Sequence, residues 1–259
     1  MRMMKKVLGT VTVLALSASL LAGCGSTAAS PVSSAASTAA ESTTSSVVPE
    51  TTFAAADENV AAAAQLLNDL TGSYQELWPV ILADNYQQTW LDDCAALVGE
   101  ENAEVAFEKL SSMVTGDVYG EDAVEAYANG GGAYFCGFTN DLATLTFDGE
   151  TSTISGTDKD GNVLFSHTYH YVGMEPVHGL YEFESDDADS GEFTYFFLAP
   201  DTSAETYHIE FRYGSDAEAL SQYDAGEYAY WVASGISTDC DQTMIDNCIE
   251  LFCTENLAG

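Results

Sequence analysis

The feature of this sequence that most limits its fold is a change in hydrophobic period at the glycines 130–132. Before them, apolar residues recur at three- and four-residue spacing, as in Tyr74, Leu77, Trp78 and Ile81, and this spacing predicts helices. After them, apolar and polar residues alternate over short runs rich in β-branched and aromatic residues, which predicts strands. The sequence therefore predicts a mainly β domain with accessory helices.

Turn signals divide the second half into short antiparallel strands. Asp148-Gly149 and Asp160-Gly161 are typical of hairpin turns. The expected strands are 142–147, 151–154, 163–171, 179–183, 193–198 and 206–213, and a final helix is expected over 236–257 with Thr238 as its N-cap. The acidic runs 158–162 and 186–192 lack a full set of calcium ligands and are expected to be a turn and a solvated loop. Many short antiparallel strands indicate a barrel or a sandwich.

The first 23 residues have the pattern of a bacterial export signal. A basic start at Arg2, Lys5 and Lys6 precedes an apolar stretch too short to span a bilayer comfortably. The stretch ends in Leu21-Ala22-Gly23-Cys24, which resembles the lipobox of bacterial lipoproteins. This resemblance implies cleavage before Cys24, lipidation of its thiol, and a location at the cell membrane on its extracytoplasmic face.

The sequence is thus expected to contain three segments. Residues 1–23 are the lipoprotein signal peptide. Residues 24–57 begin with the lipidated cysteine and continue as a disordered tether, because a Ser/Thr/Ala-rich segment buries too little apolar surface to offset its ordering entropy. Residues 58–259 form the folded domain.

Charge excludes one class of partner. The chain has 41 acidic and 6 basic residues and a net charge of −35, so it lacks the Lys/Arg clusters that neutralise phosphates. Nucleic acid is therefore not an expected partner, and the membrane is expected to be reached only through the lipid anchor. The sequence has no nucleophile-elbow, zinc-protease or phosphate-loop motif, so no enzymatic activity is expected.

The stretch 207–214 carries the residues best suited to metal chemistry. Alternate side chains of a strand share a face, so His208, Glu210 and Arg212 are expected to point the same way. An imidazole and a carboxylate two residues apart can approach one divalent ion, and both are zinc ligands. The spacing leaves two alternatives open: an ion pair between Glu210 and Arg212 on a polar strand face, or an Arg212 that receives an anionic ligand.

From about Asp69 to its end, the chain resembles the ZinT (YodA) family of bacterial extracytoplasmic zinc-binding proteins. The matching segments occur in the family's order: 70–79 (LTGSYQELWP), 171–173 (YVG), 179–184 (GLYEFE), and 199–200 (AP) followed by 208–214 (HIEFRYG). The resemblance implies an antiparallel calycin-like or lipocalin-like β-barrel with N-terminal helices and a C-terminal helix. Because similar domains form part of some zinc-importer lipoproteins, it also implies zinc as the bound ion and a metal ABC importer as a partner.

The resemblance implies a partly altered zinc site. The family uses three histidines, and their positions in this chain hold His208, Glu210 and Phe196. Glutamate can replace histidine as a zinc ligand, but phenylalanine cannot bind a metal ion. A missing ligand is expected, if present, among His167, His170 and His178, and a mixed N/O site is open to another divalent metal.

These observations lead to a main hypothesis and two alternatives. The main one is a lipid-anchored protein that binds zinc and scavenges it or delivers it to an importer. The first alternative is a barrel that has lost its metal site and holds a small organic ligand, and the second is a surface interaction protein. Five cysteines remain besides Cys24, without a C-x-x-C pair, and at least two are expected to be buried apolar residues.

Overall fold

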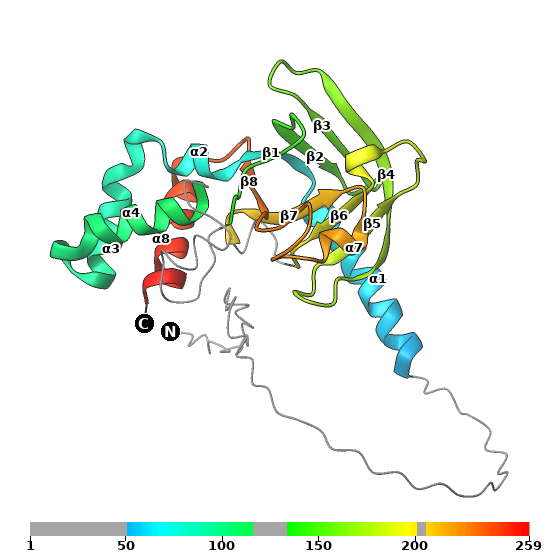
Figure 1. The fold of residues 1–259 in the computed structure, drawn as a ribbon, viewed down its shortest axis with the longest axis horizontal. Helices are drawn as coiled ribbons and strands as arrows, with labels where there is room; N and C mark the ends of the chain where they lie inside the picture. Colours follow the sequence, from blue (N-terminus) through cyan, green and yellow to red (C-terminus); the bar gives the residue numbers. More distant parts are fainter. Residues whose placement is uncertain (1–50, 116–133, 201–205, 259) are drawn as a thin grey trace, which may run out of the picture.

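The computed structural model describes residues 51–115, 134–200 and 206–258, and a closed antiparallel barrel forms its centre (Figure 1). Neighbours along the chain pair with one another, and the last strand pairs with the first. The mainly β barrel fold predicted from the sequence is confirmed. The strands are β1 Gly72–Glu76, β2 Thr144–Asp148, β3 Thr153–Thr157, β4 Val163–Met174, β5 Tyr181–Ser185, β6 Tyr195–Leu198, β7 Ile209–Gly214 and β8 Ala233–Ser237.

Strand β1 corrects the expected helix around Tyr74. Residues 72–76 are extended, and only Leu77–Ile81 form a helix, α2. The backbone of Tyr74 lies between Leu145 of β2 and Ser237 of β8, so this short strand closes the barrel. Pairing on both sides satisfies backbone groups that an open sheet edge would expose, and this outweighs the local helical spacing.

The two Asp-Gly sequences form turns, as predicted. Asp148 accepts a hydrogen bond from the backbone N–H of Glu150 at 3.1 Å, between β2 and β3. Before β4, Gly161 has a φ of 81°, and Asp158 accepts from the backbone N–H of Asn162 at 2.8 Å. The acidic oxygens of this turn therefore bind its own backbone, which is the role expected for a turn rather than a calcium loop.

Aromatic side chains fill the interior of the barrel. Phe196 is fully buried among the rings of Tyr169, Phe211 and Tyr213, with centroids between 5.4 and 6.4 Å from its own. Phe165 adds a stacked contact with the nearby 3₁₀ helix η3 (Gly191–Phe193). The alternating aromatic residues of the strands thus form a packed core.

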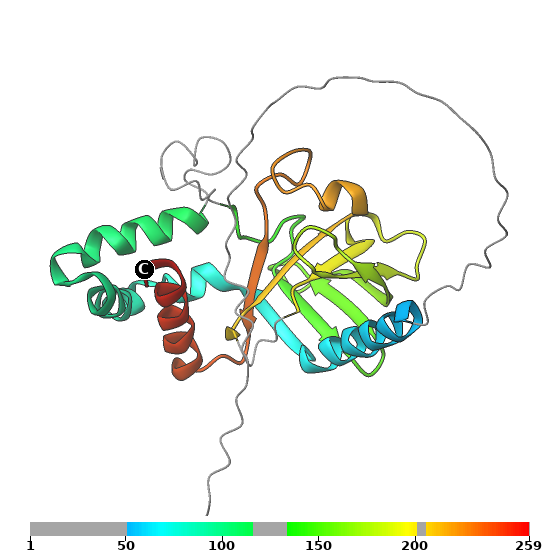
Figure 2. The same cartoon turned by 90° about the horizontal axis from the view of Figure 1, so that it is seen from below.

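A helical lobe lies beside the barrel, on the left of Figure 1 and again in Figure 2. Its core consists of buried side chains from the helices of the lobe together with Cys136 and with Ile236 of β8. Trp90 lies within this core, and its ring contacts Phe107 and Phe252. The lobe therefore has a hydrophobic core separate from that of the barrel. Its elements are α2, η1 Asp84–Tyr86, α3 Gln87–Val98, η2 Glu100–Asn102, α4 Ala103–Thr115 and α8 Gln242–Leu257.

Helix α1, Thr51–Asp69, packs on the barrel away from this lobe (Figure 2). Ala63, Leu66 and Leu67 of α1 are buried in the barrel core. The helix approaches the β2–β3 turn so closely that a Cβ added at Gly149 would lie 2.4 Å from Cα of Asn68. The helix begins at Thr51, within the segment expected to be tether.

The C-terminal helix begins later than the sequence predicts. Residues Ala233–Ser237 form β8, and α8 starts at Gln242 with Asp241 as its N-cap, accepting from the backbone N–H of Met244 at 2.9 Å. Thr238, the expected cap, instead donates its backbone N–H to the carbonyl of Ser73 at 2.8 Å. The interstrand pairing of β8 extends the chain through Ile236 and moves the helix start.

Some predicted features lie outside the described residues. These are the export signal, Cys24 and the tether up to residue 50. Within the described ranges, none of the helices is long and apolar enough to cross a membrane.

Candidate metal centre

The candidate centre lies on the outer face of the β7 region, toward the helical lobe. Ile209, Phe211 and Tyr213 belong to the barrel core, so the intervening side chains point away from it. His208, just before β7, and Glu210 are brought together as the sequence predicts, with His208 Nε2 3.6 Å from Glu210 Oε1. The His208 side chain is mostly buried at 16% exposure, whereas the Glu210 side chain is 54% exposed.

The orientation of the His208 ring is fixed from its other side. Nδ1 lies 2.7 Å from the carbonyl oxygen of Thr206, which can only accept, so Nδ1 carries a proton and donates. Tyr207 has a φ of 64°, and this left-handed turn of the backbone lies between the two residues. In a neutral ring, Nε2 is then the nitrogen with the free lone pair, and it faces Glu210.

Two cysteines lie beside this pair. The thiol of Cys248, which projects from α8 and is 2% exposed, lies beside the ring of His208. On the other side, Glu210 pairs in register with Ser234 of β8, whose backbone N–H donates to the carbonyl of Cys136 at 3.0 Å. The centre therefore joins nitrogen and oxygen donors from the β7 region with a sulfur donor from the helical lobe.

Electrostatics favour an ion pair between His208 and Glu210. Burial disfavours the imidazolium, but the neighbouring Cys248 thiol and the Glu210 carboxylate outweigh it and raise the pKa of His208 well above its ordinary value. Partial desolvation by the surrounding protein opposes the charge of the half-exposed Glu210, but the adjacent His208 imidazolium lowers the pKa of this carboxyl. Burial and then the charge of Glu210 raise the pKa of the Cys136 thiol, which stays protonated.

Arg212 does not neutralise Glu210, so the ion pair that the sequence left open is not formed. The fully buried guanidinium of Arg212 donates to the carbonyls of Leu220 and Tyr228 and lies 4.1 Å from the ring centre of Tyr223. Its two terminal nitrogens are thus used by the chain after β7, which argues against the anion-receiving alternative as well. Because Arg212 does not pair with it, the negative charge of the Glu210 carboxylate is available to pair with His208 or with a bound cation.

The imidazole of His208 and the carboxylate of Glu210 are donor types that zinc prefers, but they are fewer than the three or four protein ligands of a usual zinc site. Two ligands held about 2.0–2.1 Å from a tetrahedral zinc ion lie about 3.3 Å apart. The 3.6 Å between His208 and Glu210 is close to this spacing, and the half-exposed Glu210 side chain has room to adjust. In the part of the chain that the structure describes, no three His, Cys, Asp or Glu side chains already form a group that could hold a metal ion.

Phe196 cannot complete the centre, for a geometric as well as a chemical reason. Its side chain is fully buried inside the barrel, whereas His208 and Glu210 point outward toward the helices. The strand position that the family resemblance assigns to the third ligand is therefore on the opposite face of the sheet.

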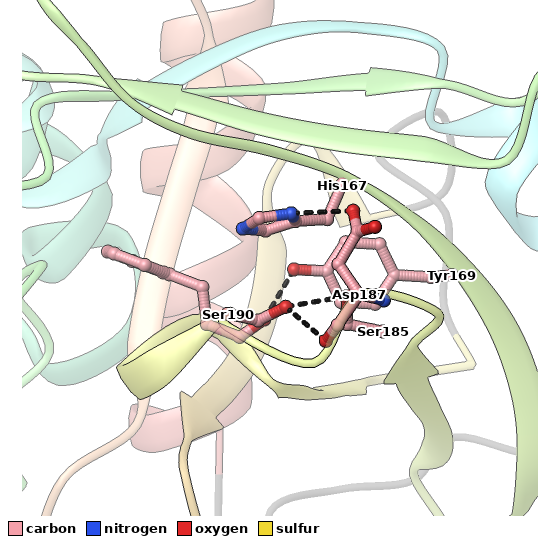
Figure 3. Close-up of polar contacts among 6 residues, drawn as sticks. His167, Tyr169, Ser185, Asp187 and Ser190 are labelled. Atoms are coloured by element: carbon pink, nitrogen blue, oxygen red, sulfur yellow. Dashed lines mark hydrogen bonds and ion pairs between the residues drawn. The ribbon is translucent and has the colours of Figure 1, made fainter.

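The other histidines lie elsewhere and bind acidic residues of their own. His167 on β4 bonds to Asp187 at 2.8 Å, and His170 bonds to Asp186 at 2.7 Å (Figure 3 shows the first pair). Neither histidine joins His208. Beside His167, the hydroxyl of Ser190 hydrogen-bonds to the backbone carbonyl of Asp187 at 2.9 Å and to Ser185 Oγ at 2.7 Å. In this arrangement the serine hydroxyl bonds to the loop and not to the imidazole.

His178 lies with Arg212 rather than with His208. Its ring packs 3.8 Å from the ring of Tyr223, the same ring that Arg212 covers. Burial lowers the pKa of His178, and the positive charge of Arg212 adds to this effect although Glu175 opposes it. None of the three histidines considered as a replacement ligand is therefore placed at the centre.

Sequence reasoning did not identify Cys248 as a neighbour of His208. Its signal was indirect: Cys248 follows Ile245 by three residues and precedes Ile249, so it lies on the buried face of α8. Which strand that face covers depends on helix docking. The expectation that at least two cysteines are buried is confirmed, since Cys94, Cys136, Cys248 and Cys253 are all buried.

This chain is similar in structure to two solved zinc-bound structures. No protein-family model matches the chain, and no curated protein sequence matches it. The Zn(II)-bound ZinT-like domain of Streptococcus pneumoniae AdcA is 17% identical and has a TM-score of 0.45 over 71% of this chain and 89% of that domain. Zn(II)-bound AdcA from Streptococcus pneumoniae is 18% identical, with a TM-score of 0.41 over 70% of this chain and 34% of the longer one. The ZinT-like resemblance predicted from the sequence is thus found again among solved structures, as a resemblance.

Proposed function

We propose that the protein is a lipid-anchored extracytoplasmic metal-binding protein that takes up zinc at His208 and Glu210 for scavenging or for delivery to an importer. The observation that carries the proposal is the arrangement of the His208 ring. Its Nδ1–H is held by the carbonyl of Thr206, and its Nε2 faces a carboxylate. A backbone carbonyl on one ring nitrogen is the usual outer support of a metal-binding histidine.

Each residue of the centre supplies a different donor atom to the metal ion. His208 supplies the nitrogen donor, Glu210 supplies an oxygen donor with a negative charge, and Cys248 is the nearest candidate for a third donor. Zinc binding displaces the proton that His208 shares with Glu210, so uptake releases a proton. Nitrogen, oxygen and sulfur donors together favour zinc over magnesium or calcium, which prefer oxygen ligands.

The aromatic interior does not favour the organic-ligand alternative. A ligand inside the barrel would have to displace stacked rings such as Phe165 and Phe193, whose centroids are 3.9 Å apart. We therefore place the binding function outside the barrel, between β7 and α8.

Calorimetric titration of zinc into the metal-free full chain at high salt tests the binding. Saturable one-to-one binding is expected, and both His208→Ala and Glu210→Ala should weaken it by more than about tenfold, because each removes a direct ligand. His170→Ala is the matched control, since this exposed histidine also binds a carboxylate but lies on β4. Equal binding by all four proteins, or heats that salt abolishes, would show diffuse attraction to the acidic surface and overturn the proposal.

The anchor is tested separately in cells. Cys24→Ser should abolish palmitate labelling, because the modified thiol is lost. A variant that still incorporates palmitate would contradict lipid anchoring at this cysteine while leaving the zinc measurement unaffected.

A further inference from the structure

Two cysteines that the candidate metal centre does not use meet inside the helical lobe. Cys94 of α3 and Cys253 of α8 are both fully buried, and their sulfur atoms are 3.8 Å apart. They are 159 positions apart in the sequence, so the contact forms only when the C-terminal helix has docked. Among the cysteines in the described ranges, this is the pair whose sulfur atoms hydrogen-bond to each other.

The helices that carry these cysteines also carry like charges toward each other. Burial raises the pKa of the Asp93 carboxyl, next to Cys94, and repulsion by Glu250 and Asp246 of α8 adds to this effect. Apolar packing, such as the contact between Trp90 and Phe252 at 5.9 Å, must hold α3 and α8 together against this repulsion. A covalent link at Cys94 and Cys253 would join the helices at the place where their charges oppose docking.

We propose that Cys94 and Cys253 form a disulfide when the chain folds in the presence of a small disulfide oxidant. One thiolate attacks the oxidant to give a mixed disulfide and release a thiolate. The second cysteine then attacks the protein sulfur of that mixed disulfide, forming the new S–S bond and expelling the other half of the oxidant. Two S–H bonds are lost, two electrons pass to the oxidant, and the oxidant leaves as two thiols.

The surroundings of the pair determine when the reaction can occur. Burial raises the pKa of both thiols, so a folded protein with α8 docked exposes little thiolate to an oxidant. The first step, formation of the mixed disulfide, is therefore expected during folding before α8 docks, and the second step as docking brings Cys253 against Cys94. Formation of the bond brings the two sulfur atoms from 3.8 Å apart to about 2.0 Å, a small movement between neighbouring helices. Burial then shields the bond from reductants.

The other cysteines have different neighbours. Cys248 lies beside the ring of His208, and Cys136 donates to the carbonyl of Tyr134 at 3.4 Å. Cys240 is partly exposed at the end of the loop before α8 and serves as the matched control. The disulfide does not depend on metal binding, so its test and the zinc titration can fail independently.

The experiment refolds the full chain, carrying Cys24→Ser, from denaturant in a mixture of oxidised and reduced glutathione. Free thiols are then alkylated, the chain is cleaved at its acidic residues, and the peptides are identified by mass spectrometry. A linked pair containing Cys94 and Cys253, lighter by two hydrogen atoms than the reduced peptides, is expected, with Cys136, Cys240 and Cys248 alkylated. This measurement requires no substitution at the pair itself.

Stability gives the second measurement. The oxidised chain should melt about 5–15 °C above the reduced chain, because the link closes a long loop of the unfolded state. Cys94→Ser and Cys253→Ser should each abolish this difference, whereas Cys240→Ser should retain it. A dominant bridge between other cysteines, mixed disulfides with glutathione alone, or five alkylated cysteines after oxidative refolding would overturn the proposal.

Discussion

At the scale of single residues, His208 is prepared for two alternative partners, a proton and a metal ion. The Thr206 carbonyl holds Nδ1, and Nε2 faces Glu210 in either case. Without a metal, the proton on Nε2 completes an ion pair with Glu210. The pair stabilises the fold most between the ordinary pKa values of the two groups, 4.5 and 6.5. Below this window Glu210 is protonated as the pH falls through its lowered pKa, and above it His208 loses its proton as the pH rises through its raised pKa.

Glu210→Gln is therefore expected to lower the pKa of His208. The amide removes the negative charge that stabilises the imidazolium, while burial, which disfavours it, remains. Titration of the His208 ring followed by NMR measures the change. Glu184→Gln on β5 is the control, because this carboxylate bonds to Tyr195 and not to His208. An unchanged pKa in the Glu210 variant would mean that Cys248 alone sustains the charged ring.

Sequence could predict part of this site and not the rest. Strand alternation placed His208 and Glu210 on one face, because that relation is local to the strand. It could not predict that the guanidinium of Arg212, on the same face, donates to the carbonyls of Leu220 and Tyr228. These lie in helix α7 (Ala217–Leu220) and in the loop after it, which fold back over β7. The neighbour Cys248 likewise comes from a helix far along the chain.

At the scale of elements, β1 shows how barrel closure overrides a local helical pattern, and α1 shows how close packing requires a glycine. The spacing of Tyr74 and Leu77 predicted a helix, but residues 72–76 complete the sheet between β2 and β8. Helix α1 then packs against the barrel at the turn that contains Gly149. A glycine is required there because the helix backbone approaches it directly and not because of its φ angle.

Gly149→Ala tests this approach. The new Cβ would lie 2.4 Å from Asn68 Cα, so α1 must shift, and we expect a loss of about 1–3 kcal/mol in the free energy of unfolding. Hydrogen exchange should show reduced protection of the α1 amides near Asn68. Gly173→Ala on β4 is the matched control, since a Cβ there meets nothing within 4 Å. Equal stability of both variants would show that α1 does not depend on this contact.

At the scale of the whole molecule, excess negative charge is the dominant electrostatic feature. The net charge is −35, and the helical lobe brings acidic residues of α3 and α8 together around Asp93. A carboxyl whose pKa is raised by folding destabilises the fold when it is ionised, and this cost disappears as the pH falls toward its folded pKa. The ion pair of His208 and Glu210 also strengthens on moving from alkaline to mildly acidic pH.

Thermal stability should therefore increase as the pH is lowered from about 8 to about 6. Added salt should raise the melting temperature at pH 8, because it screens repulsion among the acidic residues. Scanning calorimetry across this range measures both effects. Asp93→Asn should make the protein more stable at pH 8 and less sensitive to pH. A melting temperature that falls on acidification would contradict this account.

The sequence by itself determined a helical first half and a β-rich second half, the Asp-Gly turns and the shared face of His208 and Glu210, and the family resemblance implied the barrel. The two halves, the turns and the shared face follow from periodicity and turn chemistry, which act over a few residues. Tertiary structure decided that residues 72–76 close the barrel, that α8 starts at Gln242, that Arg212 is buried under the segment after β7, and that Cys94 meets Cys253. Each of these depends on contacts between segments distant in sequence, whose pairing and burial energies outweigh local preference.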